Sequence, residues 1–454
     1  MNHAIAIDIG TSKICLVYFD LVSMEVISTF SEANNTNVKF DDVHRHEQDP
    51  LQIWEIIERL LLYLSQSFCD LSSVEFISLT GQMHGILLLD ENHNPRTNLI
   101  TWRDSRAAFY SQNQSYGGSN GCIIHPGYGA HTVFALQQES LNLVKSTQLC
   151  TITSFILGKL CGIYALDETL AASLGIFDLV NKQWNQNQIK ELGLPETLFP
   201  AVIPSCIPAG TLKTKLATQF GLPHTVKIYS PIGDNQASFL GATGFIKAGV
   251  INLGTGGQLS IPCDSLDYHS SLEIRPLPFQ GYLQTYSSLC GGWAYGYLKD
   301  YCKDLLKQFG IERTDSDIYQ VLDSLALKKE TSEGLVVDTQ FLGSREKDAR
   351  LGSINNLDTK NFTIANLALG FLQGMVHELH NPVMLTEKLP FIVASGNAVR
   401  KSPVVQKVIE QEFGCACKAP PFVEEAAIGS ILGCIDDKQS VMDFYIENLG
   451  GSTS

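Results

Sequence analysis

The sequence predicts an α/β protein that contains two related domains. At 454 residues the chain is too long for one hydrophobic core, and two or three domains are expected. Short apolar runs alternate with segments of helical apolar spacing. One pattern occurs twice, as Ile7-Asp-Ile-Gly-Thr-Ser12 and as Ile251-Asn-Leu-Gly-Thr-Gly256. Each copy reads as a strand, a Gly-Thr turn and a second strand, which indicates duplication. We place the boundary near Lys227, between domains of residues 1–227 and 228–454.

The first half opens on a predicted β-hairpin. Ala4 to Phe19 consists of two apolar runs around a Gly-Thr-Ser turn. Leu51 to Phe68 has helical apolar spacing, and Val74 to Leu79 and Ile86 to Leu89 are short apolar runs typical of strands. The Gly-, Ser- and Asn-rich composition of residues 111–129 predicts a loop.

The second half repeats the order of strand, helix and hairpin. Val226 to Ile232 predicts a strand, Asn235 to Thr243 a closely packed helix, and Gly249 to Ile261 the second hairpin. Near the end we expect a strand over Phe391 to Ala394 and two helices. The first has Ser402 as N-cap, Pro403 as its first residue and Gly414 after its end. The second covers Glu424 to Cys434, where Gly429 and Gly433 permit close approach.

The composition excludes several classes of protein. With 32 basic and 47 acidic residues, the net charge of −15 argues against nucleic acid as a partner. The sequence contains no run of about 18 apolar residues, so a membrane span is not expected. Asp8 interrupts the first apolar run, which argues against a secretory signal. The 12 cysteines are scattered, as is typical of a reducing compartment, so we expect a cytoplasmic protein.

The common catalytic and nucleotide motifs are missing from the sequence. It has no GxxxxGK[ST], no GxGxxG between a strand and a helix, no HExxH and no GxSxG nucleophile elbow. The two Gly-Thr turns remain. Their small residues let backbone N–H groups approach phosphate oxygens, although such a turn by itself is more often only a hairpin turn. Asp8, just before the first turn, has a structural role or holds Mg²⁺ through water.

Asp234 has two interpretations from its local sequence. It lies between Gly233 and the first turn of a predicted helix, so it can be an N-cap that stabilises the helix by about 1 kcal/mol. The helix N-terminus would also keep it ionised. Alternatively, it accepts the proton of a hydroxyl that attacks a phosphorus atom, as the catalytic Asp of kinases does.

Taken together, the motifs resemble those of the FGGY carbohydrate kinases. Seven short segments occur in the family's order and spacing from Asp8 to Gly429. They are Asp8-Ile-Gly-Thr-Ser12, Thr80-Gly-Gln-Met-His-Gly85, Thr101-Trp-Arg-Asp-Ser-Arg106, Gly233-Asp-Asn-Gln-Ala-Ser238, Leu253-Gly-Thr-Gly256, Ser395-Gly-Asn397 and Glu425-Ala-Ala-Ile-Gly429. The resemblance implies two actin-like, ribonuclease-H-like domains, with ATP and a sugar in the cleft between them.

The resemblance also assigns roles to residues. It makes Asp234 the catalytic base and implies Mg²⁺ at Asp8 and Asp234. The ATP-binding residues would be Asp8, Gly10, Thr11 and Ser12 in the first phosphate loop, Gly254, Thr255 and Gly256 in the second, and Gly396, Asn397 and Arg400 around the adenosine. The sugar pocket would be lined by Met83, His84, Trp102, Asp104 and Asn235. The first domain would bind the sugar and the second ATP.

The identity of the sugar depends on finer features. The Gln-Met-His-Gly and Trp-x-Asp segments resemble the xylulokinase and sedoheptulokinase branches of the family. The compact length, the Gly-Asp-Asn-Gln-Ala-Ser form and the segment Gly127 to Thr132 favour the sedoheptulokinase branch. We therefore expect a ketose kinase that makes sedoheptulose 7-phosphate. D-Xylulose is the alternative acceptor, and an inactive actin-like ATP-binding protein is the alternative from a different class.

Overall fold

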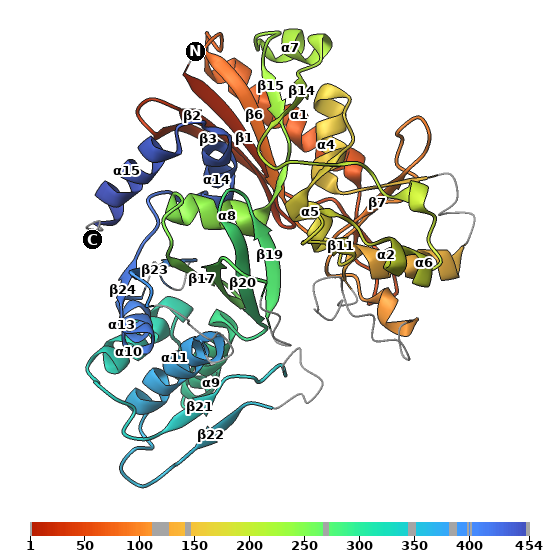
Figure 1. The fold of residues 1–454 in the computed structure, drawn as a ribbon. Helices are drawn as coiled ribbons and strands as arrows, with labels where there is room; N and C mark the ends of the chain where they lie inside the picture. Colours follow the sequence, from red (N-terminus) through yellow and green to blue (C-terminus); the bar gives the residue numbers. More distant parts are fainter. Residues whose placement is uncertain are drawn as a thin grey trace.

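The computed structural model describes residues 2–110, 127–140, 147–266, 272–343, 351–380, 388–396, 399 and 402–450. The predicted α/β class is confirmed, with two large sheets that lie on either side of a central layer of helices (Figure 1). Among these residues, no helix has the length and apolar character that a membrane span requires.

The first sheet has seven strands and lies in the N-terminal half. The order is β14-β15-β6-β1-β2-β3, and β16 extends the pairing of β6. Its strands are β1 (His3–Ile9), β2 (Lys13–Asp20), β3 (Glu25–Ala33), β6 (Val74–Gly81), β14 (Pro208–Thr211), β15 (Lys227–Tyr229) and β16 (Ile232–Gly233). Strands β1 and β2 pair antiparallel, so the predicted N-terminal hairpin is confirmed.

The second sheet has six strands in the order β19-β20-β18-β17-β23-β24. They are β17 (Gly249–Leu253), β18 (Gly257–Cys263), β19 (Glu273–Leu277), β20 (Gly281–Ser288), β23 (Phe391–Ser395) and β24 (Ala416–Lys418). The hairpin β17–β18 pairs with the parallel strand β23, just as the hairpin β1–β2 pairs with the parallel strand β6. The repeat in the sequence therefore corresponds to a repeated sheet topology.

The chain passes from the first sheet to the second between Gly233 and Gly249. Both β15 and β16 pair with β6 in the first sheet, and the second sheet begins only at Gly249. The predicted single strand over Val226 to Ile232 is in fact two short strands, interrupted at Ser230 and Pro231. Proline has no N–H for a sheet hydrogen bond, which accounts for the interruption. The division of domains at Lys227 stays a prediction.

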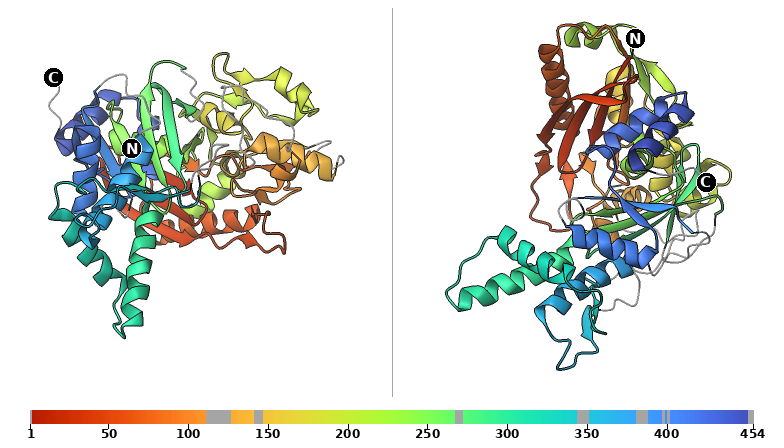
Figure 2. Two further views of the ribbon diagram at one scale, coloured as in Figure 1. Left: turned by 90° about the horizontal axis from the view of Figure 1, so that it is seen from below. Right: turned by 90° about the vertical axis from the view of Figure 1, so that its left-hand side faces the viewer.

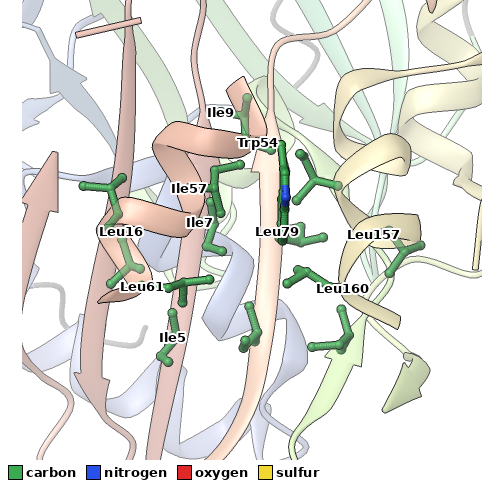
Figure 3. Packing of buried hydrophobic residues seen from close by; sticks show 14 of the residues in the cluster. Ile5, Ile7, Ile9, Leu16, Trp54, Ile57, Leu61, Leu79, Leu157 and Leu160 are labelled. Carbon is green, nitrogen blue, oxygen red and sulfur yellow. The ribbon is translucent and has the colours of Figure 1, made fainter. Parts of the chain in front are cut away.

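Alternating side chains along β1 point to two different cores. Ile5, Ile7 and Ile9 face the outer helices, whereas Ala4 and Ala6 face the central ones. Helices α1 (Pro50–Ser67), α4 (Ile152–Cys161) and α7 (Thr214–Phe220) cover the outer face. Figure 3 shows this packing. A strand buried on both faces reads as one continuous apolar run, which is the pattern found in the sequence.

The central layer consists of α8 (Asp234–Thr243), α14 (Glu425–Cys434) and α15 (Lys438–Leu449). One core cluster joins these helices to both sheets, through residues such as Phe19 of the first sheet and Val393 of the second. A Cβ added at Gly429 of α14 would lie 1.8 Å from the carbonyl oxygen of Ala237 in α8, and one at Gly433 2.5 Å from Cys206 Sγ. The close approach predicted for these glycines is confirmed.

Further helices cover the far face of the second sheet. They are α9 (Gly292–Gln308), α10 (Asp315–Leu327), α11 (Ile364–His380) and α13 (Pro403–Phe413), with the small hairpin of β21 (Val336–Asp338) and β22 (Ser353–Asn355) beside them. Helices α9 and α10 project from the body of the molecule in both views of Figure 2. Helix α13 begins and ends as predicted, with Gly414 in the left-handed conformation after it.

Short elements inserted in the N-terminal half flank the first sheet. The strands are β4 (Asn37–Val38), β5 (Glu47–Gln48), β7 (Leu87–Leu89), β8 (Leu99–Ile100), β9 (Gln148–Cys150), β10 (Leu166–Asp167), β11 (Phe177–Asp178), β12 (Gln183–Trp184) and β13 (Val202–Ile203). The helices are α2 (Gly129–Glu139), α5 (Glu168–Ser173), α6 (Gln186–Glu191) and two 3₁₀ turns, Arg106–Phe109 and Glu196–Leu198. Residues 111–126 of the predicted loop over 111–129 lie outside the described residues. The last residue of that loop, Gly129, is the first residue of α2.

Candidate active site

A cavity of about 930 Å³ lies where the two halves of the molecule meet. Its walls come from β1, the segment after β6, the first turn of α8 and the second sheet. Nine of the predicted site residues line it: Asp8, Gly10, Thr11, Met83, His84, Trp102, Asp104, Asp234 and Asn235. These residues are far apart in the sequence, and the fold brings them to one cavity.

A second cavity, of about 1160 Å³, lies in the C-terminal half and is lined by Gly254 and Thr255. Helices α9, α10, α11 and α13 form its walls, with aromatic side chains of Trp293 and Tyr319. Consecutive residues at the end of β17 line the two cavities: Asn252 lines the first and Leu253 lines the second, from opposite faces of the strand. A ligand with a polar end at the Gly254 turn would thus reach toward the first cavity.

The remaining predicted residues fall outside these linings. Ser12 and Gly256 belong to the two hairpin turns but line neither cavity. Gly396 follows β23 with a φ of +95°, and its Cα lies so close to β17 that an added Cβ would be 2.4 Å from the carbonyl oxygen of Leu253. Only glycine combines this backbone conformation with that approach. Asn397 and Arg400 lie outside the described residues.

Asp234 is the first residue of α8, and the interpretation of Asp234 as an N-cap is wrong. The N-cap is Gly233, and no side chain caps this helix. Burial raises the pKa of Asp234 to about 6, although the guanidinium of Arg275 and nearby backbone N–H groups lower it. The helix N-terminus therefore does not keep this carboxyl at its ordinary pKa, because desolvation outweighs it. A carboxyl poised near pH 6 at a cavity wall is typical of an acid–base group.

Asp8 lies at the end of β1, in the same cavity as Asp234. Burial, together with the charges of Asp234 and Glu424, raises the pKa of Asp8 to about 8, against the opposing effect of Lys13. Its Oδ1 is buried and has no hydrogen-bond partner among the described residues. Two carboxylates this close repel each other, and a divalent cation would relieve both the repulsion and the unmet acceptor.

A chain of hydrogen bonds orders the first Gly-Thr turn. Gln48 Nε2 donates to the carbonyl of Thr11 (2.9 Å), and Thr11 Oγ1 donates to Gln82 Oε1 (3.2 Å). Trp102 Nε1 donates to Thr11 Oγ1 (3.0 Å). The indole is 41% exposed, so Trp102 is a cavity residue rather than part of a core. The turn and the sugar-pocket residue Trp102 are thus held by one network.

The segment after β6 adopts a backbone conformation that side chains rarely take. His84 has a φ of +68°, and two hydrogen bonds to Ser173 hold it there: its N–H donates to Ser173 Oγ (3.1 Å) and its Nδ1 pairs with the Ser173 carbonyl (2.7 Å). The imidazole stacks on Tyr128, with ring centroids 4.3 Å apart. A non-glycine residue kept at positive φ is often found at functional sites.

Asp104 lines the cavity, but its carboxylate is already engaged. Its oxygens accept from the Nε and Nη2 of Arg106 (2.8 and 2.7 Å), from the Arg106 backbone N–H (3.1 Å) and from the His46 backbone N–H (2.9 Å). A carboxylate has about four acceptor positions, and these bonds fill them. The geometry therefore favours a role for Asp104 in shaping the pocket over direct hydrogen bonds to the sugar.

Sequence reasoning missed several polar residues at the wall formed by the second sheet. Asn235 Nδ2 donates to Gln258 Oε1 (2.6 Å), and Gln258 in turn donates to Ser287 Oγ (3.0 Å). Arg275 also lines the cavity and is 8% exposed. The available signal was the Glu273-Ile-Arg275 alternation within an apolar strand, which puts two charged side chains on one face.

Helix α13 shows one further difference from the sequence prediction. Ser402 is its N-cap residue, but its hydroxyl makes no capping hydrogen bond. Instead Ser402 Oγ is buried without a partner among the described residues, and the residue lines the second cavity.

The comparisons with known proteins define the class. The model of the FGGY family of carbohydrate kinases, N-terminal domain, matches residues 3–241, which is more than half of the chain. The chain therefore belongs to the FGGY carbohydrate kinase family. It is a phosphotransferase with an alcohol group as acceptor.

Its curated relatives differ in their sugar. The chain is 24% identical to sedoheptulokinase of Mus musculus over 402 residues, covering 81% of this chain and 82% of the relative. It is 26% identical to xylulose kinase of Staphylococcus epidermidis over 404 residues, covering 85% and 77%. It is 22% identical to gluconokinase of Bacillus subtilis over 481 residues, covering 97% and 90%.

Solved structures share the fold. Ligand-bound xylulose kinase from Lactobacillus acidophilus matches with a TM-score of 0.86 at 20% identity, covering 98% of this chain and 92% of that one. Glycerol kinase of Plasmodium falciparum with ADP matches with a TM-score of 0.83 at 18% identity, covering 98% and 92%. The expected pair of actin-like, ribonuclease-H-like domains is thereby confirmed.

Proposed function

We propose that this kinase transfers the γ-phosphoryl group of ATP to the terminal hydroxyl of sedoheptulose, giving sedoheptulose 7-phosphate and ADP. The observation that carries the proposal is the position of the two cavities at the same end of β17. Asp8 and Asp234 lie in the first cavity with Met83 and His84, and the second cavity begins one residue further along β17. A sugar in the first cavity and the phosphates of ATP that extend from the second past the Gly254 turn would meet at the end of β17.

The proposed mechanism depends on proton acceptance by Asp234. As the sugar hydroxyl attacks phosphorus, its proton passes to the Asp234 carboxylate. The pKa of about 6 leaves most of this carboxyl ionised at pH 7, and its basicity exceeds that of an ordinary Asp. Backbone N–H groups of the two Gly-Thr turns, Gly10–Ser12 and Gly254–Gly256, would bind phosphate oxygens.

The sugar would be oriented by the first half of the molecule. Met83, His84, Trp102 and Asn235 line the cavity beside Asp234 and offer both apolar and hydrogen-bonding contacts. The adenosine would lie in the second cavity, and we keep the prediction that Gly396, Asn397 and Arg400 flank it. Closure of the two halves would exclude water, which otherwise competes with the sugar as acceptor.

Asp8 and Asp234 are the residues that would hold Mg²⁺. The buried, unpartnered Oδ1 of Asp8 and the mutual repulsion of the two carboxylates fit a hard cation with oxygen ligands. When bound with the nucleotide, Mg²⁺ supplies charge stabilisation to the phosphate oxygens. Within the described part of the chain, no cluster of three or more His, Cys, Asp or Glu side chains could hold a metal. Two carboxylates with ATP phosphates suit magnesium, which rarely has an all-protein cage.

D-Xylulose is the second candidate acceptor. The xylulose kinase of Staphylococcus epidermidis is 26% identical to this chain, and the structure from Lactobacillus acidophilus has a TM-score of 0.86. Sedoheptulose is two carbons longer than D-xylulose, so the depth of the sugar cavity would decide between them. We also expect the enzyme to act in the cytoplasm, in keeping with free cysteines throughout the described residues.

The deciding experiment is ADP release from Mg-ATP with sedoheptulose, D-xylulose, D-ribulose, gluconate and glycerol in turn. The Asp234→Asn variant, which keeps the shape of the side chain, is the control. We expect sedoheptulose-dependent ADP release that falls at least about 10³-fold in the variant. A preference for D-xylulose would correct the substrate. ATP binding without any sugar-dependent release would instead support the inactive actin-like protein.

A further inference from the structure

Strand β19 brings Arg275 of the second sheet to the wall of the first cavity, and Glu273 lies two residues before it on the same strand. Ile274 belongs to the same core cluster as Met83 and Ile86 of the first half, so the strand is embedded in that half. Gln236 Nε2, in the first turn of α8, donates to the Pro276 carbonyl (3.2 Å) and ties β19 to the helix that carries Asp234. Because side chains alternate along a strand, Glu273 and Arg275 lie on the face opposite to Ile274.

Arg275 is held by Glu273 through one carboxylate oxygen. Its Nε donates to Glu273 Oε2 (3.0 Å) and its Nη2 donates to the same oxygen. Arginine has five N–H donors in a planar fork, and the pairing with Glu273 uses two of them. Arg275 lines the cavity together with Asp234 and is close enough to influence its charge.

The pair joins the two halves of the sugar pocket electrostatically. Burial alone would raise the pKa of Glu273, but Arg275, His84 and the Tyr128 hydroxyl together lower it below its ordinary value. Glu273 is therefore ionised and matches the charge of Arg275. His84 and Tyr128 come from the first half, whereas Glu273 and Arg275 come from the second. The stacked rings of His84 and Tyr128 and the ion pair of Glu273 and Arg275 therefore form one polar group that joins the two halves.

We propose that Arg275, oriented by Glu273, is a specificity-determining residue that donates hydrogen bonds to hydroxyl oxygens of a neutral sugar and disfavours anionic sugar acids. A guanidinium neutralised by Glu273 offers donors without a net positive charge. Of the other charged residues on the cavity lining, Asp234 is mostly ionised at pH 7 and influences the charge of Arg275, so it repels a carboxylate at this position, whereas Arg103 is a cation of the same lining. This inference rests on the proposed function, since it names the chemical class of acceptor at the same site.

A role in stability alone explains the ion pair of Glu273 and Arg275 less well than a role in sugar binding. A buried ion pair is often no more stabilising than apolar residues of the same volume, because desolvation offsets the attraction. Arg275 lies at a cavity wall rather than inside a core, and its fork is only partly used. Polar groups that are placed with spare donors around a pocket are those that fix the orientation of a ligand.

The test compares Arg275→Gln, Arg275→Lys, Glu273→Gln and the double variant Glu273→Gln/Arg275→Gln. Calorimetry measures the binding of sedoheptulose, D-xylulose and gluconate without nucleotide, and kcat/KM is measured for the same sugars. We expect Arg275→Gln to weaken ketose binding about 10- to 100-fold, with partial rescue by lysine. Glu273→Gln exposes the charge of Arg275, so the ratio of gluconate to ketose binding should rise at least about 10-fold.

Each outcome decides the proposal. The double variant leaves no buried charge without a partner, so it replaces Arg275→Gln in the binding measurement if that single variant does not fold. We expect it to weaken ketose binding to a similar extent. Ketose binding within twofold of wild type in a folded Arg275→Gln or double variant would overturn the proposal, as would an unchanged gluconate-to-ketose ratio in Glu273→Gln. Wild-type protein that binds a ketose but never phosphorylates it would refute the kinase function alone, because the binding measurements still test Arg275. Wild-type protein that binds no sugar would refute both.

Discussion

Replacing Gly429 by alanine tests how the helix pair α8 and α14 holds the catalytic residue. An added Cβ would lie 1.8 Å from the carbonyl oxygen of Ala237 and 2.6 Å from the backbone nitrogen of Gly241. Both are backbone atoms that no rotamer change can move. A normal carbon–oxygen contact is about 3.4 Å, so the helices must separate by about 1.5 Å.

The expected loss of stability is the balance of two effects. Overpacking typically costs about 1–3 kcal/mol, and a clash between two backbones belongs at the upper end of that range. Alanine in place of glycine in a helix regains about 1 kcal/mol. We therefore expect Gly429→Ala to lower the free energy of unfolding by about 2 kcal/mol. Asp234 is the first residue of α8, and a displacement of about 1 Å at a catalytic group can cost about 10²-fold in kcat.

Urea unfolding and turnover with the preferred sugar measure the two effects. Gly296→Ala in α9 is the matched control, because the nearest atom to its added Cβ is the Tyr319 hydroxyl at 3.3 Å. The same substitution there should leave the protein equally stable or more stable by up to about 1 kcal/mol. If Gly429→Ala unfolds at the wild-type urea concentration and keeps its kcat, the α8–α14 contact does not hold Asp234.

Two other substitutions test the electrostatics of the site. The folded-state pKa of Asp8, about 8, lies above its unfolded value, so ionisation destabilises the fold increasingly as the pH rises from about 4 to 8. Asp8→Asn should therefore raise the melting temperature of the ligand-free protein, and the increase should grow over this pH range. Activity should be lost in this variant. An increase in melting temperature that is independent of pH would contradict this explanation. Lys13→Met removes the partly exposed ion pair of Lys13 with Glu424 (2.8 Å), and should change stability by no more than about 1 kcal/mol. A larger change that persists in 1 M salt would refute this estimate.

Local pattern predicted the elements that carry the site. The apolar runs around both Gly-Thr turns, the helix after Gly233 and the helix from Pro403 to Phe413 all lie where the sequence placed them. Helical and strand periodicity act over a few residues, so they can be read without knowing the partners. The family motifs extended this to the site, since nine predicted residues line one cavity.

The roles of individual side chains depended on neighbours that are distant in the chain. Asp234 looked like a helix cap from its local sequence, and burial together with Arg275, 41 positions away, determines its pKa. Asp104 looked available to a sugar, but Arg106 and the backbone of His46 fill its acceptor positions. No local pattern could predict either outcome.

The sequence by itself determined the two hairpins, the duplication and the family, because strand and turn preferences and short motifs are local properties of the chain. Only the tertiary structure decided that α14, from the end of the chain, packs between the two sheets and that β19 inserts Arg275 beside Asp234. Such contacts depend on the burial of both faces of a sheet and on close backbone approach, which brings together residues as distant in the chain as Ala237 and Gly429. Proximity of that kind arises from packing, and a linear pattern does not record it.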